Sequence, residues 1–337
     1  MKGKKIVSTL LALLLLASLP VSALAAEWDI SNGDITVNAG SGGQTVTQGG
    51  GAAVPDSAPV ITGTSKENNV TINADSGQTA SVTLSGVNID VRDKGKAAVS
   101  TTGEGNVSIE LNGENTLKSG EDHAGLEKNN GGSLTIADED KDGKLTAEGG
   151  KYGAGIGGGN KGNGNNIAIT GGEVKATGGY GGAGIGGGNK GDGKDIAISG
   201  DAKVDAQGGN QSGAGIGGGK EGAGSGIAIS GGEVKATGGV NGAGIGGGLQ
   251  DKGKDITVSG AAKLKVQGGV EDDHTGAGAG LGDGGSRSTG SDWGGSPVPG
   301  AEVEPDICAL KPDGKIEYYA PGSDKTGTPS KTVANHS

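Results

Sequence analysis

The amino-acid sequence predicts an all-β protein, a right-handed parallel β-helix of about seven to nine coils with three short strands in each coil of about 30 residues. Three observations predict this class. Glycine accounts for 78 of the 337 residues, phenylalanine is absent, and one block of sequence recurs along the chain. Scarce aromatic residues exclude a conventional globular core, and interior glycines destabilise helices by about 1 kcal/mol each relative to alanine. The recurrence at fixed spacing favours a solenoid over disorder.

Residues 1–26 predict a secretory signal peptide. Lysines near the start precede an apolar run at 6–17, and Ala23 and Ala25 supply a small-x-small cleavage pattern. We therefore expect a secreted, extracellular protein that is either released or held at the cell surface. The net charge of −11 argues against nucleic-acid binding. No later segment is apolar enough for membrane insertion.

Each repeat contains three alternating strings separated by turn residues. The first string reads Ala-Gly-Ile-Gly-Gly-Gly and lies at 154–159, 183–188, 214–219 and 243–248. The second lies at 167–169, 196–198, 227–229 and 256–258. The third lies at 174–176, 204–206, 234–236 and 264–266. Alternation with a period of two residues is typical of strands, so each repeat supplies three strands of one coil.

The chain divides into four predicted regions. They are the signal peptide at 1–26, an N-terminal cap with an irregular first coil at 27–81, the β-helix with glycine-rich repeats at 82–284, and a linker with a disordered tail at 285–337. A cap is expected because an open end exposes core residues and unpaired strand edges. Further short strands are predicted at 35–37, 60–61 and 316–319.

Several segments resemble exported carbohydrate-binding-domain or glycine-rich surface proteins of Gram-positive anaerobes. The resemblance lies in the segments at 28–35, 82–91 and 106–126 and in the glycine-rich coils, and it covers roughly residues 28–285. It implies a surface-associated protein that binds polysaccharide. A related group of calcium-dependent, pectin-binding parallel β-helices has a similar strand pattern, which implies acidic plant polysaccharide as the substrate class.

The first candidate site is acidic. Residues 138–143 read Asp-Glu-Asp-Lys-Asp-Gly, which matches the opening of an EF-hand or dockerin-type calcium loop. In this interpretation Asp138, Asp140 and Asp142 bind Ca²⁺. The twelfth position of the loop is Gly149 instead of a carboxylate, so an acidic turn between two strands is the alternative.

The second candidate site is aromatic. Tyr152 and Tyr180 precede the isoleucine of the first string by four and five residues, so stacked coils place them side by side. Two exposed rings offer apolar area to sugar faces with little side-chain entropy to lose. The alternative is that the rings shield a corner of the coil.

Two polar corners at 121–123 and 271–274 combine carboxylates with a histidine, as metal sites and acid–base pairs do. They are predicted to lie several coils apart, which favours separate polar loops. Beside the third string, Glu173, Lys203 and Glu233 alternate in sign, which indicates a solvated face that keeps its register.

The outward positions of the first string are glycines, which has two interpretations. One is a flat surface without side chains that contacts a polysaccharide or a second copy of the protein. The other is tight packing between strand and turn, with no ligand.

No catalytic set is recognisable. Arg92 and Arg287 are the only arginines, and no cluster of aspartates recurs on neighbouring coils as glycosidase chemistry requires. We therefore predict a secreted, noncatalytic protein that recognises polysaccharide. Two alternatives stay open: a structural or adhesive rod of the cell envelope without a defined sugar ligand, and a pectin-degrading β-helix enzyme.

Overall fold

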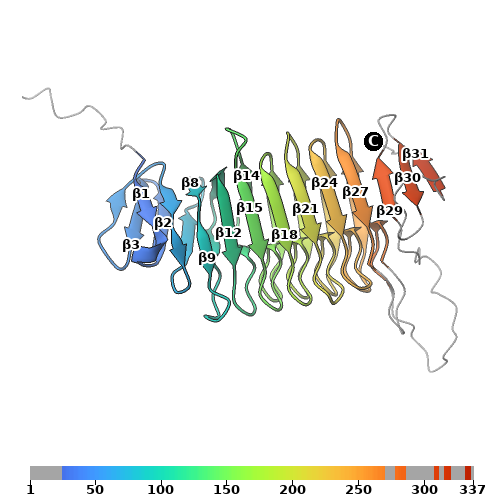
Figure 1. Ribbon diagram of the computed structural model, residues 1–337, viewed down its shortest axis with the longest axis horizontal. Coiled ribbons are helices and arrows are strands. Elements are labelled where there is room, and N and C mark those ends of the chain that lie inside the picture. The colour runs from blue at the N-terminus through green and yellow to red at the C-terminus, as the bar shows by residue number, and fades with distance from the viewer. Residues whose placement is uncertain (1–24, 270–277, 286–306, 311–314, 320–330, 335–337) are drawn as a thin grey trace, which may run out of the picture.

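The protein is a rod-shaped parallel β-solenoid of about eight turns (Figure 1). The computed structural model describes residues 25–269 and 278–285, together with the backbone of strands at 307–310, 315–319 and 331–334. The predicted signal peptide lies almost entirely outside these residues. Within them, the single helical element is a 3₁₀ turn at Ile30–Asn32, and no helix is long and apolar enough to span a membrane. The predicted all-β class with three strands per coil is confirmed.

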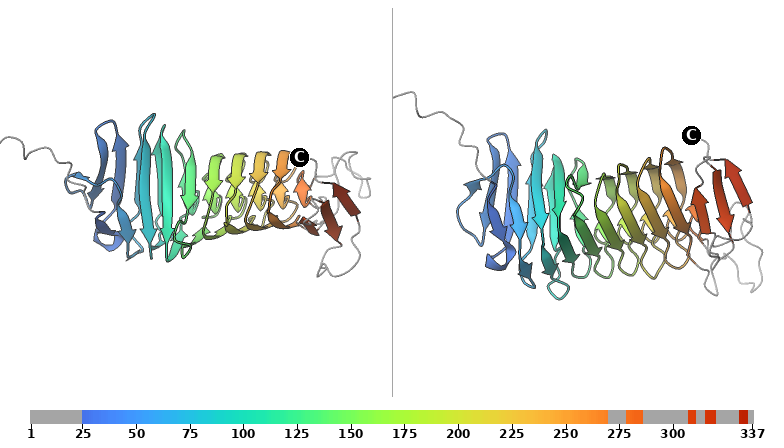
Figure 2. Two further views of the ribbon diagram at one scale, coloured as in Figure 1. Left: turned by 90° about the horizontal axis from the view of Figure 1, so that it is seen from above. Right: turned by 45° about the horizontal axis from the view of Figure 1, so that its top comes forward.

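Three sheets run along the rod, and each coil contributes one strand to each (Figure 2). Sheet A contains, in order, β1 (Glu27–Asp29), β5 (Val60–Thr62), β8 (Thr79–Ser85), β11 (Asn106–Asn112), β14 (Leu134–Ala137), β17 (Gly164–Ile169), β20 (Gly193–Ile198), β23 (Gly224–Ile229) and β26 (Gly253–Val258). Sheet B contains β4 (Val54–Pro55), β3 (Gly43–Gln48), β2 (Ile35–Gly40), β7 (Val70–Ala74), β10 (Val99–Gly103), β13 (Leu126–Lys128), β16 (Ile156–Gly157), β19 (Ile185–Gly186), β22 (Ile216–Gly217), β25 (Ile245–Gly246) and β28 (Leu281–Gly282). Sheet C contains β6 (Thr64–Ser65), β9 (Asn88–Asp90), β12 (Glu114–Lys118), β15 (Lys144–Glu148), β18 (Glu173–Thr177), β21 (Lys203–Gln207), β24 (Glu233–Thr237), β27 (Lys263–Gln267), β29 (Ile307–Leu310), β30 (Lys315–Tyr319) and β31 (Lys331–Ala334).

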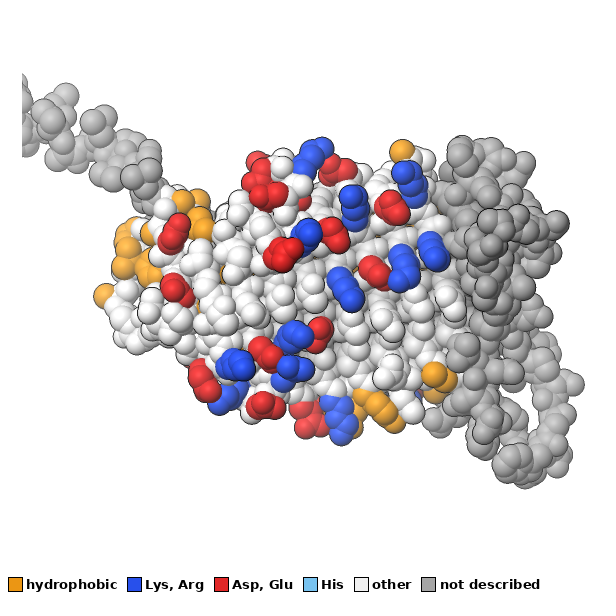
Figure 3. All heavy atoms as spheres, viewed as in Figure 1, with side chains coloured by type: hydrophobic (Ala, Val, Ile, Leu, Met, Phe, Trp, Pro, Cys, Tyr) orange, Lys and Arg blue, Asp and Glu red, His pale blue; other side chains and the backbone are white. Residues whose placement is uncertain are grey.

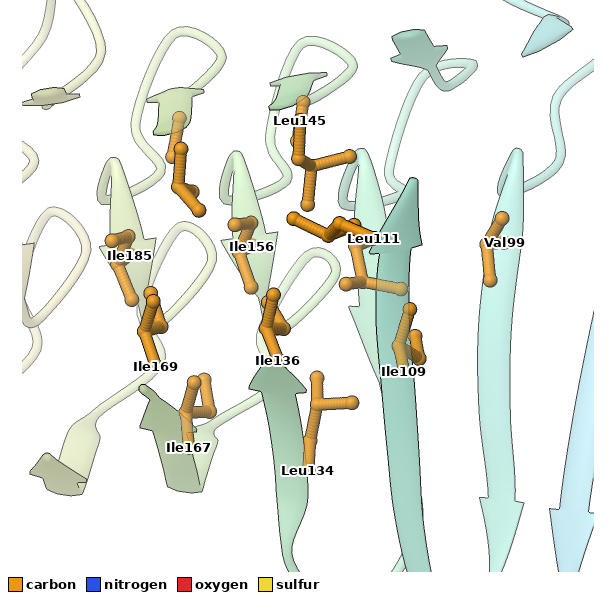
Figure 4. Packing of buried hydrophobic residues seen from close by; sticks show 14 of the residues in the cluster. Val99, Ile109, Leu111, Leu134, Ile136, Leu145, Ile156, Ile167, Ile169 and Ile185 are labelled. Carbon is orange, nitrogen blue, oxygen red and sulfur yellow. The ribbon is translucent and has the colours of Figure 1, made fainter. Parts of the chain in front are cut away.

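Identical or similar apolar residues stack on one another inside the solenoid (Figure 4). In sheet A, Ile169 pairs in register with Ile198, which pairs with Ile229. In sheet B, Ile156 pairs with Ile185. All of these side chains are fully buried. Burying such a side chain stabilises the fold by about 1.5–3 kcal/mol, so stacked aliphatic residues supply the core without phenylalanine.

The outward glycines of the first string are buried, which corrects the interpretation of a flat exposed surface. The Ala154 amide donates to the Gly158 carbonyl (2.9 Å), so the string forms a tight arch with Ile156 at its inner side. Gly155 and Gly157 are buried. A Cβ atom on Gly157 would overlap the carbonyl oxygen of Gly186 on the next coil. Packing of strand against turn therefore explains these glycines.

Regular coils begin earlier than the predicted boundary at residue 82. Residues 27–81 already contribute strands to all three sheets, and β2 pairs with β7 in parallel register from Ile35↔Val70 onward. Only β3 and β4 depart from the coil, as an antiparallel extension of sheet B. These coils lack the glycine strings, and they keep the inward alternation that forms strands.

The predicted tail contains more structure than expected. Strands β29, β30 and β31 continue sheet C beyond β27 in antiparallel order. The predicted strand at 316–319 corresponds to β30. An antiparallel extension pairs the exposed edge of β27, as capping of a solenoid end requires. Most of the predicted linker lies outside the described residues.

Candidate functional site at the tyrosine corner

The corner between sheets C and B consists of short turns stacked coil on coil. The turns at 120–123, 150–153 and 179–182 each close with a hydrogen bond from the last residue to the first. The Gly150 amide donates to the His123 carbonyl, and the Gly179 amide donates to the Gly153 carbonyl, each at 2.9 Å. A Cβ atom on Gly150 would overlap the carbonyl oxygen of Gly120 one coil away. Side chains larger than hydrogen therefore lie at the middle positions of these turns, and His123 at the end of the first turn is the one exception.

The stacking gathers chemically varied side chains on one ridge, which we call the tyrosine corner. Its members come from the middle of the three turns and from the end of the first: Glu121, Asp122, His123, Lys151, Tyr152 and Tyr180. The sequence analysis identified the tyrosines and residues 121–123 as separate candidates. The turn glycines at positions 120, 150 and 179 recur at the coil spacing, and this recurrence could have predicted that both candidates lie on the same corner.

The two tyrosines are neighbours, as the coil register predicted. Their ring centroids lie 6.2 Å apart and the ring planes meet at 88°, an edge-to-face pair. Such pairs contribute about 0.5–1.5 kcal/mol beyond area burial. Tyr180 is 44% exposed, whereas Tyr152 is half-buried. The pair is therefore an angled edge with one well-exposed ring, and it is not a flat double platform.

A lysine completes the aromatic part of the corner. The Nζ atom of Lys151 lies 4.9 Å from the centroid of the Tyr152 ring and 3.5 Å from a carboxylate oxygen of Glu121. A hydrogen bond with Tyr152 and attraction to it, followed by Glu121, hold the pKa of Lys151 above its ordinary value. The amine is therefore a charged hydrogen-bond donor at neutral pH.

His123 is oriented by a buried carboxylate. Its Nδ1 atom lies 2.8 Å from Oε2 of Glu127, and the same oxygen accepts from the Ala124 amide at 3.0 Å. Asn129 donates to the other carboxylate oxygen of Glu127 at 2.6 Å. With Nδ1–H donating to Glu127, the neutral imidazole has Nε2 as an acceptor. Next to it, Asp122 accepts from the side chain of Asn160 at 2.9 Å.

A buried lysine ends strand β13. Lys128 is 5% exposed, and its Nζ atom donates to the Asn130 carbonyl at 2.7 Å. Burial lowers the pKa of Lys128 from 10.5 to about 8. Desolvation of the ammonium therefore opposes folding at neutral pH.

Lys128→Met is expected to raise the free energy of unfolding by about 2 kcal/mol at pH 7, because the desolvation cost exceeds the lost hydrogen bond. Below about pH 8 the amine is protonated in both states and the cost is fully present. Between about pH 8 and 10.5 the folded state releases its proton first, so the stability of the wild type rises with pH. Urea titrations at pH 7 and pH 10 measure this. If the difference in the free energy of unfolding between Lys128→Met and wild type is as large at pH 10 as at pH 7, the prediction is wrong. Lys161→Met, at an exposed lysine, is the control.

The predicted calcium ligands are only partly brought together. Oxygens of Asp138, Asp140 and Glu110 lie within 4.8 Å of one another, whereas Asp142 stands outside this group and accepts from the Gly113 amide at 3.2 Å. Burial, followed by the neighbouring carboxylates, raises the pKa of Glu110. Glu110 lies in strand β11 of the preceding coil. Sequence reasoning missed it because it is far in the sequence from the acidic turn at 138–143.

Both oxygens of Asp138 cap its own turn. One accepts from the Lys141 amide at 3.0 Å and the other from the Gly143 amide at 3.2 Å. This arrangement is that of an acidic turn, the alternative left open by the sequence. The second polar corner, at 271–274, lies outside the described residues.

Four segments of the chain match a family model described as Beta helix repeat. They are residues 141–160, 167–189, 196–220 and 227–249. The coils are similar to β-helix repeats. The match and the three parallel sheets together support a parallel β-helix of the right-handed type. No curated protein and no solved structure matches the chain.

Proposed function

We propose that this β-helix protein is a secreted, noncatalytic carbohydrate-binding protein whose tyrosine corner binds an extended polysaccharide. The observation that carries the proposal is the exposed Tyr180 ring packed edge-to-face on Tyr152. In the described part of the chain, Val54 and Tyr180 are the only large hydrophobic side chains that are exposed. Two adjacent tyrosine rings, one of them exposed, favour a role in binding, because tyrosine presents an apolar ring and a polar hydroxyl to a ligand.

The groups around the rings suit a sugar. A tyrosine ring offers an apolar face to the C–H groups of a pyranose, while its hydroxyl stays available for hydrogen bonding. Glu121 and Asp122 are acceptors for sugar hydroxyls, and Lys151 is a donor. Such a combination of apolar area with a few placed polar groups is typical of ligand sites. Because successive turns are about 4.8 Å apart along the rod, the corner suits a chain that runs along it.

Replacing both rings tests the proposal. Tyr152→Ala with Tyr180→Ala is expected to weaken polysaccharide binding at least about tenfold, equivalent to about 1.4 kcal/mol. A glycan array selects the ligand from neutral and acidic plant and host polysaccharides, pectin included, and affinity electrophoresis measures the change. Tyr152→Phe with Tyr180→Phe keeps the rings and should retain most of the binding, and Val54→Ala should retain all of it. If the double alanine variant is retarded by the polysaccharide in the gel as strongly as wild type, the tyrosine corner is not the binding site.

The array also separates the alternatives. If the protein binds no glycan on the array, a structural or adhesive rod of the cell envelope is favoured. Release of unsaturated products or loss of viscosity in pectin solutions favours an enzyme. The acidic group of Glu110, Asp138 and Asp140 offers three carboxylates, whereas calcium takes six to eight oxygen ligands. Running the array with calcium and with chelator therefore decides whether calcium assists; equal binding in both removes calcium from the proposal.

A further inference from the structure

The outer face of sheet C bears two columns of charged side chains that run along the rod (Figure 3). We call it the charged face. Pairing in register places the following residues of the first column on successive coils: Glu114, Lys144, Glu173, Lys203, Glu233 and Lys263. The second column, two positions along each strand, contains Thr116, Thr146, Lys175, Asp205, Lys235 and Lys265. The first column alternates in sign at every coil.

Most of these charges have no partner within the described part of the molecule. Two ion pairs form between adjacent coils: Lys144 with Glu114 at 3.4 Å and Lys235 with Asp205 at 3.0 Å. The rest of the first column, from Glu173 to Lys263, forms no ion pair among the described residues although its members stack in register. These side chains are exposed and line a groove between the columns. The face therefore presents alternating charges to a partner.

We propose that the charged face is a self-association surface, on which two copies of the protein pair in antiparallel orientation. Consider a two-fold axis that lies in the interface, parallel to the strands and midway between β18 and β21. It reverses the order of the coils and keeps each position along the strand. Closed two-fold pairing of this kind is the commonest symmetry of homo-oligomers.

This symmetry places opposite charges against each other throughout the first column. Glu173 faces Lys203 of the second copy, Lys144 faces Glu233 of the second copy, and Glu114 faces Lys263 of the second copy. Each contact occurs twice, which gives six pairs of opposite charge.

The same axis also suits the second column. Lys175 faces Asp205 of the second copy, and the remaining lysines face Thr146 and Thr116. No like charges meet in either column.

Other partners fit the face less well. Two copies in parallel register place like charges opposite each other when the axis runs along the first column, and they place Lys263 against Lys265 of the second copy when the axis runs between the columns. A polyanion meets Glu173, Asp205 and Glu233, and a polycation meets the lysines between them. Only a partner that alternates in sign at the coil spacing meets opposite charges along the whole column, and a second copy of the protein does so.

The size of the face sets the strength of the association. Six coils at about 4.8 Å and five residues at about 3.3 Å give a patch of roughly 30 by 16 Å. That is smaller than the about 800 Å² per partner of a standard interface. We therefore expect weak dimers at low ionic strength that dissociate as salt screens the charges. The proposal is independent of polysaccharide binding, because the tyrosine corner lies outside both columns.

Charge swaps at the central contact give a sharp test. Glu173→Lys places lysines opposite each other at the two central contacts, and Lys203→Glu places glutamates there. Each variant alone is expected to dimerise roughly tenfold more weakly than wild type. An equimolar mixture restores all six pairs and is expected to form heterodimers as well as wild type dimerises. Sedimentation velocity at about 20 mM and 500 mM salt measures this, with Lys161→Glu, on a glycine-rich turn, as a control for net charge. Misfolding of either variant cannot produce recovery in the mixture.

Engineered cysteines test the orientation. In a Cys308→Ser background, Thr146→Cys with Lys235→Cys places two thiols three coils apart, about 14 Å, beyond the reach of an internal disulfide. The antiparallel pair brings them face to face, so mild oxidation is expected to give covalent dimers. Thr146→Cys with Lys265→Cys should give few covalent dimers, because these two positions do not face each other in the antiparallel pair. Wild type that sediments as a monomer at low salt, or swap variants that fail to recover on mixing, would overturn the proposal.

Discussion

Gly186→Ala is expected to lower the free energy of unfolding by more than about 3 kcal/mol. Gly186 has φ of +129°, a region that L-residues with a side chain rarely adopt, and a Cβ atom there would overlap the carbonyl oxygen of Gly217. The carbonyl belongs to the next coil, so relief of the overlap requires two coils to separate and their hydrogen bonds to lengthen. Backbone strain and lost pairing therefore add.

Gly42→Ala is the matched control for this prediction. A Cβ atom on Gly42 meets no atom within 4 Å, and its φ lies outside the positive region. The control is expected to change stability by less than about 1 kcal/mol. Urea unfolding followed by far-ultraviolet circular dichroism compares the two. Equal losses for Gly42→Ala and Gly186→Ala would show that glycine has no special role at the coil corners.

Ile198→Ala is expected to lower the free energy of unfolding by about 2–5 kcal/mol. Ile198 is fully buried and stacks in register between Ile169 and Ile229. Both neighbours are fixed by their own coils, so the core cannot collapse into the space that the substitution leaves.

The control for the core prediction is Ile256→Ala. Ile256 is only partly buried at the C-terminal end of sheet A, so its loss should be smaller, about 1 kcal/mol. The same urea titrations apply, and a broadened transition for Ile198→Ala would indicate that the coils on either side unfold separately. If the two variants lose the same stability, the core is not a rigid stack.

The strands were predictable because their chemistry is local. Ile167 and Ile169 alternate with outward residues, and the same alternation returns at a spacing set by the coil. The glycine strings were harder to interpret. Gly155 looks like an outward, side-chain-free position in the sequence, and only the arch between Ala154 and Gly158 buries it. Contacts between a strand and a folded-back turn leave no periodic signal.

The candidate sites show the same limit. Tyr152 and Tyr180 could be placed together because their distances from the repeat isoleucines are similar. The contact of Lys151 with Glu121 joins two turns whose sequences differ. Glu110 reaches the acidic turn from the preceding coil. In a solenoid, side chains meet across coils, so a motif confined to one loop describes only part of a site.

Hydrogen–deuterium exchange of the full chain with its best glycan tests the binding site most directly. The proposal predicts slower exchange at the turns 120–123, 150–153 and 179–182, and unchanged exchange across the strands of sheet C. The double alanine variant of Tyr152 and Tyr180 should lose that protection at the same glycan concentration. Protection confined to another face, or saturable binding with no change at these turns, would contradict a ligand site at the tyrosine corner.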